Sequence, residues 1–406
     1  MKLYCFVLLL FLASLNVFGQ KFVISGTVVN DRTGAVIPQV SVSAEGERTS
    51  VVTNDEGFFS LKLDKMPRTL VVSHLGFETL RFALPSSNVS SLSIRLKPTS
   101  LVLQEVVVWT ENPRDLVQLA LSKVPENYST KPVLYKCFYR EAAMKRKHYI
   151  YVAEGVVDMY KTSYKQNSFR DKVSILKGRR LLSPKESDTL GVKVLGGPVM
   201  PLYFDIVKNT DFLLNEEDMA NYDFKMDGFT VIDDRVQYVV ILSPLIWTPW
   251  ALFYGKIYID HDNLSFSRME LSLDMRDTPR ATNYMLRKKP NGVRFKPKEF
   301  TILVDYKQDE GKTHISYLRS TYRFNCDWKR KLFATNYSVT CEMMVTDRQE
   351  DDVQPIRGRE SFDSRDAFYD KVDYFLDTKF WEDYNIIEPT ETLDKAIDKL
   401  LKKYKK

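Results

Sequence analysis

Side chains that commonly carry catalysis are sparse in this chain. It has four histidines, His74, His148, His261 and His314, and none belongs to the His-Glu-x-x-His arrangement of zinc peptidases. The sequence lacks the Gly-x-Ser-x-Gly elbow of serine hydrolases. It also lacks the glycine-rich loops that bind nucleotide phosphates. We therefore predict structural histidines, no metal site and no cofactor, and we interpret the protein as a non-enzyme.

Carboxylates are numerous, but their spacing does not define a catalytic pair. The densest run, Glu350-Asp351-Asp352, is typical of a solvated loop, and Asp233-Asp234 is typical of a turn. A catalytic pair needs two carboxyls in one cleft with separated pKa values. Spacing along strands cannot establish that arrangement. A periplasmic hydrolase without a recognisable motif therefore stays the alternative to a binding protein.

One segment has the composition of a binding loop. Residues 244–254 are apolar and aromatic, and two prolines make a regular central strand or helix there unfavourable. Such a loop beside a sheet could line an apolar pocket or contact a membrane. Its candidate ligand-binding residues are Trp247, Trp250, Phe253 and Tyr254. The alternative is a loop that fills the core, because buried aromatic side chains usually serve packing.

The cysteines carry a second open question. Cys5 lies in the leader, and Cys137, Cys326 and Cys341 remain in the mature chain. Cys326 and Cys341 flank a turn-like segment between two strand-like runs, so antiparallel pairing centred there would bring them close. A disulfide is a candidate, although it depends on a Cα separation that the sequence cannot supply. Buried free thiols are the alternative.

The first 19 residues resemble a secretory signal peptide. Lys2 precedes an apolar stretch from Leu3 to Leu15, and Val17-Phe18-Gly19 suits cleavage before Gln20. The apolar stretch is shorter than the roughly 20 residues of a membrane-spanning helix. No cysteine follows the cleavage site directly, so we do not expect a lipoprotein. We predict a periplasmic or outer-membrane-associated protein.

Length and charge narrow the function classes. The chain of 406 residues is long enough for two or three domains. Its formal charge of +6 is spread along the sequence rather than gathered in a stripe. Nucleic-acid binding leaves a concentrated basic footprint, so we exclude nucleic acid as a partner.

Residues 22–98 predict a small β-sandwich. Short strand-like runs recur there at close spacing, with turn signals between them. The segment resembles the carboxypeptidase-regulatory-like domain through the runs Ser25-Gly26-Thr27-Val28, Ile37-Pro38-Gln39-Val40-Ser41-Val42, Thr53-Asn54-Asp55-Glu56-Gly57-Phe58-Phe59-Ser60-Leu61 and Ser73-His74-Leu75-Gly76-Phe77. That resemblance implies a seven-strand transthyretin-like sandwich, common at the front of outer-membrane proteins of Bacteroidota and without catalytic residues of its own.

Residues 99–130 read as a linker strand and a helix. Leu103-Gln104-Glu105-Val106-Val107-Val108 resembles the stretch after this domain in TonB-dependent receptors, where strand addition to a partner is one use. A linker inherited with the domain is the alternative. Asn112 as N-cap and Pro113 in the first turn predict the start of the helix.

Residues 131–346 predict a broad antiparallel curved sheet. Successive hairpins are expected around Asp233-Asp234, His261-Asp262-Asn263, Asn291-Gly292 and residues 308–311. The run Gly255-Lys256-Ile257-Tyr258-Ile259-Asp260 resembles the lipoprotein-carrier half-barrels. Residues 380–389, Phe-Trp-Glu-Asp-Tyr-Asn-Ile-Ile-Glu-Pro, resemble uncharacterised Bacteroidota envelope proteins that share the front domain.

Residues 347–406 form a C-terminal extension that ends in an amphipathic helix. Leu393, Ile397 and Leu400 recur at helical spacing, opposite a lysine-rich face. Such a helix can lie on a membrane, but packing on its own sheet is the commoner use.

These observations predict a mainly β protein: a seven-strand transthyretin/Ig-like sandwich followed by a large, half-barrel-like antiparallel sheet with a few helices. We expect a non-catalytic envelope protein that binds or scaffolds. Its partners would be envelope proteins or an apolar ligand, with peripheral membrane contact as a further option.

Overall fold

A computed structural model describes residues 22–85, 91–99, 112–185, 192–194, 196–329, 333–374 and 380–404. The leader and the Glu105–Val108 strand expected from the sequence lie outside these ranges. No helix of the described residues is long and apolar enough to cross a membrane.

The N-terminal strands form a two-sheet sandwich. One sheet has the order β4-β1-β7 and the other β3-β2-β5-β6. The strands are β1 (Phe22–Asn30), β2 (Ser41–Ala44), β3 (Ser50–Val52), β4 (Phe58–Leu63), β5 (Thr69–Ser73), β6 (Leu80–Ala83) and β7 (Leu92–Leu96). Buried side chains such as Ile24, Val42, Phe59 and Leu70 fill the space between the sheets. The predicted seven-strand sandwich is confirmed.

The turn before β4 explains one of the sequence motifs. The Asn54 side chain accepts hydrogen bonds from the backbone N–H groups of Glu56 and Phe58, at 2.9 and 3.0 Å. Gly57 has a φ of 72°, and a Cβ there would lie 2.8 Å from the carbonyl oxygen of Val28. The Asn-Asp-Glu-Gly sequence therefore suits this turn because of backbone geometry.

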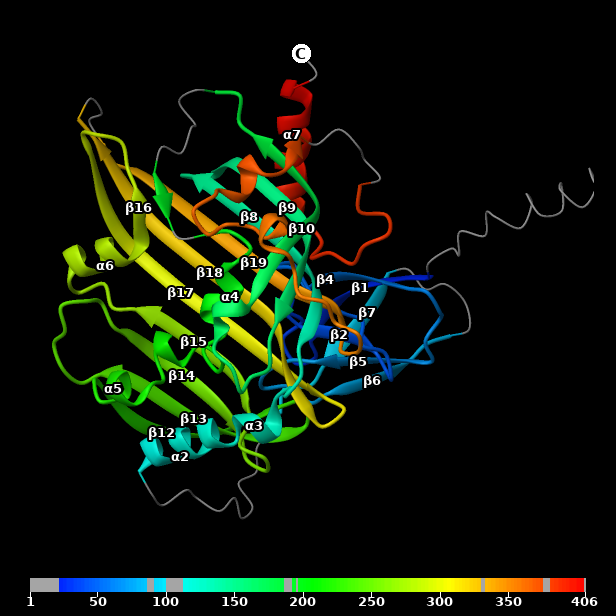
Figure 1. The fold of residues 1–406 in the computed structure, drawn as a ribbon. Coiled ribbons are helices and arrows are strands. Elements are labelled where there is room, and N and C mark those ends of the chain that lie inside the picture. The colour runs from blue at the N-terminus through cyan, green and yellow to red at the C-terminus, as the bar shows by residue number, and fades with distance from the viewer. Residues whose placement is uncertain are drawn as a thin grey trace, which may run out of the picture.

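Most of the remaining chain forms one open sheet of eleven strands (Figure 1). Its order is β12-β13-β14-β15-β17-β18-β19-β8-β9-β10-β20. The strands are β8 (Val133–Lys145), β9 (His148–Lys161), β10 (Lys172–Leu182), β12 (Tyr222–Ile232), β13 (Arg235–Pro244), β14 (Phe253–Asp260), β15 (Phe266–Leu273), β17 (Val293–Asp309), β18 (Lys312–Trp328), β19 (Thr335–Gln349) and β20 (Asp373–Tyr374). Only the β10–β20 pair is parallel. The predicted large antiparallel sheet is thus confirmed.

Three of the four expected hairpins form as predicted. Asp233 and Asp234, with φ of 52° and 59°, join β12 to β13, and residues 261–265 join β14 to β15. Glu310 and Gly311 join β17 to β18. The prediction of a hairpin at Asn291-Gly292 is wrong. The strand before this turn, β16 (Leu286–Lys288), pairs with β11 (Lys193–Val194). β17 instead takes β15 as its neighbour.

The two faces of the large sheet have different coverings. Tyr139, Ala143 and Val157 belong to the main core on the inner face. Phe138 and Val156 point the other way and share a core with the sandwich. This alternation follows from the two-residue period of a strand. Both faces of β8 and β9 are therefore buried.

Helices and short loops cover the inner face of the sheet. The helices are α2 (Pro113–Ser122), α3 (Val124–Asn127), α4 (Met200–Phe204), α5 (Glu216–Met219) and α6 (Thr278–Met285), with single turns η1 (Ser168–Arg170), η3 (Thr210–Phe212), η4 (Gly358–Glu360) and η5 (Phe368–Asp370). Asn112 caps α2 as predicted, accepting from the backbone N–H of Arg114 at 3.1 Å. Leu116, Val117 and Ala120 of α2 join the main core. In Figure 1, α4 and the segment before β20 lie across the sheet.

The segment 380–389 joins the sandwich to the large sheet. Trp381 is buried and packs edge-on against Phe138, with ring centroids 5.7 Å apart. Its Nε1–H donates to Glu154 at 3.1 Å. Asn385 exchanges two hydrogen bonds with the backbone of Lys62 on β4, at 2.7 and 3.0 Å. This sequence motif therefore has a structural role between the two parts of the chain.

The C-terminal helix α7 (Glu391–Tyr404) packs on the outer face of the same sheet. Leu393, Ile397 and Leu400 form a small buried cluster with Val152 of β9 and Leu181 of β10. Tertiary packing accounts for the apolar stripe that the sequence displays.

Candidate functional site

A cavity of about 610 Å³ lies on the inner face of the large sheet. Its floor is formed by β8, β9 and β19, and its walls by residues 192–194 and 196–203, by β16 and by residues 364–369. Most of the wall is apolar, from the side chains of Ile150, Leu182, Val192, Val194, Met200, Val339 and Phe368. Its volume is in the range of sites that hold small organic ligands, roughly 300–1,000 Å³.

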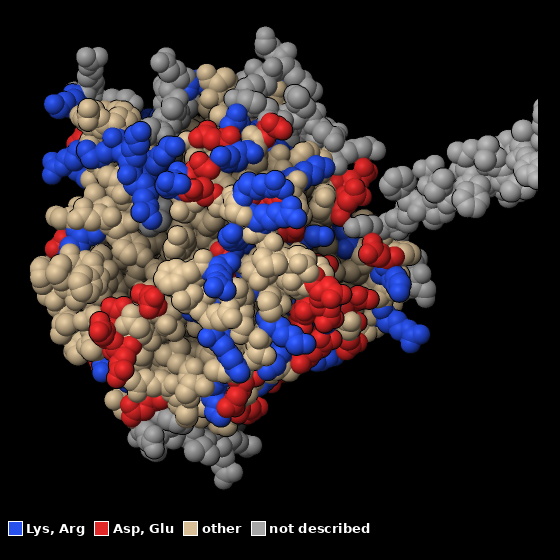
Figure 2. All heavy atoms as spheres, viewed as in Figure 1, with Lys and Arg blue, Asp and Glu red and all other residues tan. Residues whose placement is uncertain are grey.

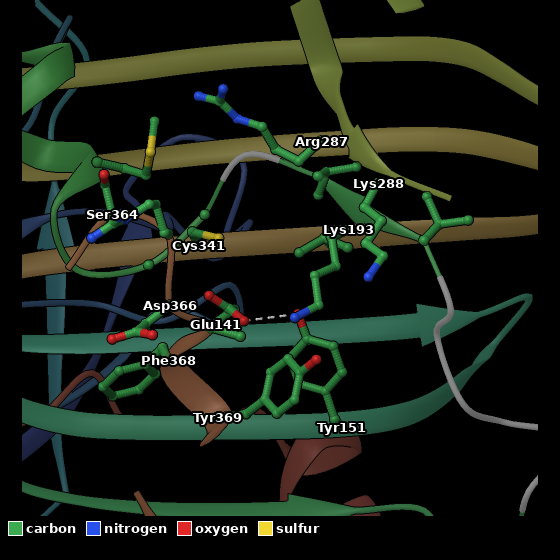
Figure 3. A pocket seen from close by; sticks show the side chains of 18 of the residues that line it. Glu141, Tyr151, Lys193, Arg287, Lys288, Cys341, Ser364, Asp366, Phe368 and Tyr369 are labelled. Carbon is green, nitrogen blue, oxygen red and sulfur yellow. Dashed lines mark hydrogen bonds between the residues drawn. The ribbon is translucent and has the colours of Figure 1, made fainter. Parts of the chain in front are cut away.

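Glu141 is the acidic group of the cavity floor (Figure 3). It lies on β8, where the strand period turns Tyr139 and Glu141 inward and Arg140 outward. The hydroxyls of Tyr139 and Tyr151 donate to its two carboxyl oxygens at 3.0 and 2.9 Å. No described Lys or Arg lies within ion-pairing distance of this carboxyl.

The surroundings of Glu141 favour its neutral form. Burial raises the pKa of the Glu141 carboxyl above its usual 4.5, and the two tyrosine hydrogen bonds oppose that effect without cancelling it. A protonated carboxyl keeps one O–H donor. Once protonated, Glu141 can offer a hydrogen bond to a polar group that reaches the cavity floor.

The opposite end of the cavity is basic. Lys193 of β11 and Lys288 of β16 are directly paired in register, and Arg287 lies beside them. In Figure 3 the Lys193 and Lys288 side chains run down towards the cavity floor, whereas the Arg287 guanidinium points away from them. Figure 2 shows Lys and Arg side chains gathered on this face over β16. The site thus has a largely apolar wall, a buried acid at its floor and three basic side chains in its lining.

Two buried ionic clusters hold the covering segment against the sheet. Lys161 of β9 pairs with Asp205, which also accepts from Tyr164 and Tyr306 at 2.7 and 2.9 Å. Burial alone would raise the pKa of Asp205, but Lys161 and the tyrosine hydroxyls outweigh it and hold the pKa below its usual range. Three residues further on, Lys208 pairs with Asp171 at 2.8 Å. This anchoring positions α4, and with it the cavity wall around Met200.

Cys341 lies opposite Glu141 in the β19–β8 register and also lines the cavity. Burial raises the pKa of its thiol far above the usual value, so the thiol stays protonated. A protonated thiol is a weak nucleophile. Cys341 therefore contributes to the wall and not to covalent chemistry.

The disulfide considered between Cys326 and Cys341 does not form, because both are buried free thiols. The β18–β19 hairpin exists, but Cys341 pairs with Ser320 and Cys326 with Thr335. The two cysteines are thus six residues apart in register, roughly 20 Å at about 3.3 Å per residue. A disulfide requires Cα atoms closer than about 7 Å.

The aromatic residues chosen from the sequence do not line this cavity. Phe253 is buried in the main core, with its ring centroid 5.2 Å from that of Phe212. Trp247, Trp250 and Tyr254 are 71%, 52% and 48% exposed. Core packing therefore accounts for Phe253 and leaves the two tryptophans without a buried role.

The histidines also lie outside the cavity lining. His314 is buried next to the Tyr135 hydroxyl at 2.9 Å, and burial lowers its pKa to about 4. His261 lies in the β14–β15 turn beside Asp262. Among the described residues, no group of three or more His, Cys, Asp or Glu side chains is placed to hold a metal ion. The cavity does bring polar groups together, so the hydrolase interpretation stays a prediction.

The sequence analysis did not identify Glu141 or the basic residues that line the cavity. One signal was available for Glu141: it interrupts a run of apolar residues at alternate positions, Tyr135, Cys137, Tyr139 and Ala143. A charged residue on a buried strand face is uncommon unless it has a partner. Lys193 and Lys288 are far apart in sequence, and no local pattern predicts their pairing.

The fold is a β-sandwich docked on an open antiparallel sheet that carries a cavity with apolar and charged lining residues. Residues 24–108 match the model of the CarboxypepD_reg-like domain. No curated protein matches the chain.

Solved structures offer only distant similarity. A putative outer membrane lipoprotein-sorting protein domain from Vibrio parahaemolyticus is 8% identical, with a TM-score of 0.27, covering 61% of this chain and 94% of that one. A DUF1329 family protein from Desulfovibrio piger is 8% identical, with a TM-score of 0.24 and coverages of 60% and 95%. Lipovitellin, in a structure of its lipid-protein interactions, is 10% identical, with a TM-score of 0.26 and coverages of 62% and 28%. These scores are too low to carry an argument about function.

Proposed function

We propose that the protein is a non-catalytic, exported binding protein of the bacterial envelope that holds an amphipathic molecule with an acidic head group in the cavity. The observation that carries this proposal is the composition of the cavity itself. Its wall is largely apolar, and Lys193, Arg287 and Lys288 also line it. An acyl or other apolar chain would lie along Val339, Met200 and Ile150, with its acidic head between the basic side chains.

The physical balance favours such a ligand over a wholly apolar one. Burying apolar surface contributes about 25 cal/mol per Å². Neither Lys193, Arg287 nor Lys288 forms an ion pair with a described carboxylate, so an anionic head group would gain charge-assisted hydrogen bonds there. The leader-like residues 1–19 and the CarboxypepD_reg-like domain support an envelope location.

Binding of a dansyl-labelled undecanoic acid tests the proposal. The probe should bind wild type with enhanced, blue-shifted fluorescence. Val339→Phe adds volume inside the cavity and should weaken binding by about tenfold or more, the effect of roughly 1.4 kcal/mol. Thr340→Phe is the matched control, because the next residue of β19 faces away from the cavity. Equal affinities of the two variants would contradict the site.

The role of the basic residues in the cavity lining is tested with the same probe. Lys288→Glu should weaken binding of the acid more than binding of the corresponding dansyl-labelled alcohol. Loss of binding to both compounds in equal measure would contradict the assigned orientation of the ligand. Melting temperatures of each variant establish that the fold is retained.

A further inference from the structure

The loop between β13 and β14 exposes an unusual amount of apolar surface. Of the twelve large hydrophobic side chains that are exposed among the described residues, five lie within residues 245–254. They are Leu245, Ile246, Trp247, Trp250 and Tyr254. Single exposed hydrophobic residues are ordinary, but a contiguous group marks an interaction site.

The loop is held in a defined shape. Arg280 of α6 donates to the carbonyl oxygens of Thr248 and Trp250 at 2.6 and 3.4 Å. Its guanidinium carbon lies 5.0 Å from the centre of the Trp247 ring. The Thr248 hydroxyl donates to the Trp250 carbonyl at 2.7 Å, and the backbone N–H of Asp274 donates to Leu252 at 2.8 Å. The tryptophans are therefore displayed by a braced loop.

The core does not need these side chains. Ala251, Leu252 and Phe253, at the end of the same loop, are 5%, 5% and 3% exposed and supply its buried contacts. Trp247 and Trp250 remain outside, at 71% and 52%. Two indole rings exposed to water are unfavourable, so contact with an apolar surface outside the chain would stabilise them.

Charge around the loop indicates what that surface is. Residues 244–254 contain no charged side chain. On one side, residues 274–289, which include α6 and β16, contain five basic and two acidic residues, and the two acidic residues pair with Arg276 and Arg280. On the other side, the backbone N–H of Leu245 donates to Asn221, next to the acidic helix α5. The remaining basic residues of the first side, at 287–289, suit the surface of an anionic bilayer. Tryptophan in particular favours the head-group region of membranes.

The size of the loop also favours a lipid surface over a protein partner. A standard protein interface takes about 20–30 residues from each side. The exposed apolar group here is confined to one short loop. A bilayer needs no complementary shape, so a few inserted side chains suffice.

We propose that the loop 245–250 inserts Trp247 and Trp250 into the head-group region of an anionic bilayer. Arg280 braces the loop, and α6 leads directly into β16, which carries Arg287 and Lys288. Docking would therefore bring β16, whose basic residues line the cavity, towards the lipid surface. This inference goes beyond the proposed cavity ligand and does not depend on it.

Vesicle sedimentation tests the inference. The full mature chain is mixed with vesicles of phosphatidylcholine alone or of phosphatidylcholine with phosphatidylglycerol. Wild type should sediment with the anionic vesicles, and salt should weaken the binding. Trp247→Ala/Trp250→Ala should lose at least about tenfold in partition, as should Ile246→Glu, a second variant at a 52% exposed position. Phe169→Ala, at an 83% exposed residue elsewhere, is the matched control and should bind normally.

The outcomes separate the alternatives. Quenching of Trp fluorescence by brominated lipid, lost in the double variant, would support insertion. Wild type that fails to sediment, or a double variant that sediments as wild type does, would overturn the proposal. A concentration-dependent dimer that the double variant abolishes would assign the loop to a second copy of the chain and overturn it as well. Val339→Phe should still bind vesicles, which separates this result from failure of the cavity proposal.

Discussion

At the scale of single residues, the molecule uses buried charge in two distinct ways. Glu154 lies between Arg140 and Arg179, and although burial would raise its pKa, the two guanidinium groups hold it at about 2. Glu141, on the neighbouring strand β8, has hydrogen bonds from two tyrosine hydroxyls and the Gly197 backbone but no ion pair with a described residue, and its pKa is raised. The paired carboxylate fastens the segment 380–389, whereas the unpaired one faces a cavity. This contrast separates Glu154, which has a structural role, from Glu141, which lines the cavity.

Replacing Glu141 with Gln should change how stability depends on pH. In wild type the unfolded chain releases the Glu141 proton near pH 4.5, while the folded chain keeps it to a higher pH. Stability from this group is therefore lost as pH rises from 4.5 through the folded-state pKa, by about 1.4 kcal/mol per pH unit within that window. Glu141→Gln should lack this loss. The measurement is the free energy of unfolding in urea across a pH series.

Glu217→Gln, at an exposed position on α5, is the control and should follow the wild-type curve. If the curves of Glu141→Gln and wild type run parallel over the same range, Glu141 is not held protonated by the fold.

At the scale of elements, turns and helix caps could be predicted from local sequence, whereas the pairing of strands far apart in the chain could not. The Asp233-Asp234 turn and the Asn112 cap were predictable because the residues that form them are adjacent in sequence. The pairing of β8 with β19 closes the middle of the sheet across some two hundred residues, and no local pattern specifies it. The same limit explains the Asn291-Gly292 error, since β16 finds its partner in β11.

The register of strand pairing was the second feature that could not be predicted from the sequence. The β18–β19 hairpin was expected, but its centre could not be derived, and the offset of Cys326 from Cys341 depends on it. A strand shifted by one residue turns every side chain to the other face. The floor of the cavity, where Glu141 meets Cys341 in register, was for that reason beyond sequence reasoning.

Removing Trp381 should weaken the junction between the sandwich and the large sheet. Trp381→Ala deletes a buried ring that packs on Phe138, together with a hydrogen bond to Glu154. The free energy of unfolding in urea should fall by about 3 to 5 kcal/mol. Trp250→Ala, at a 52% exposed position, should change it by less than about 1 kcal/mol. An unaltered unfolding curve for Trp381→Ala would mean that the segment 380–389 does not hold the two parts together.

At the scale of the whole molecule, the sandwich and the sheet behave as one structural unit. Their side chains share a continuous core, and polar contacts such as Arg319 to Asp55, at 2.6 Å, cross the boundary. The CarboxypepD_reg-like domain covers the outer face, while the cavity opens on the inner face. The sandwich therefore packs behind the sheet that forms the floor of the cavity.

The most direct test is mass spectrometry of an organic extract from the mature protein, purified natively from its own envelope. Our account predicts a stoichiometric amphiphile with an acidic head group. It should be depleted in Val339→Phe and retained in Thr340→Phe. A wild-type protein that carries no such molecule, or variants that carry it equally, would contradict the assignment of the cavity as a ligand site.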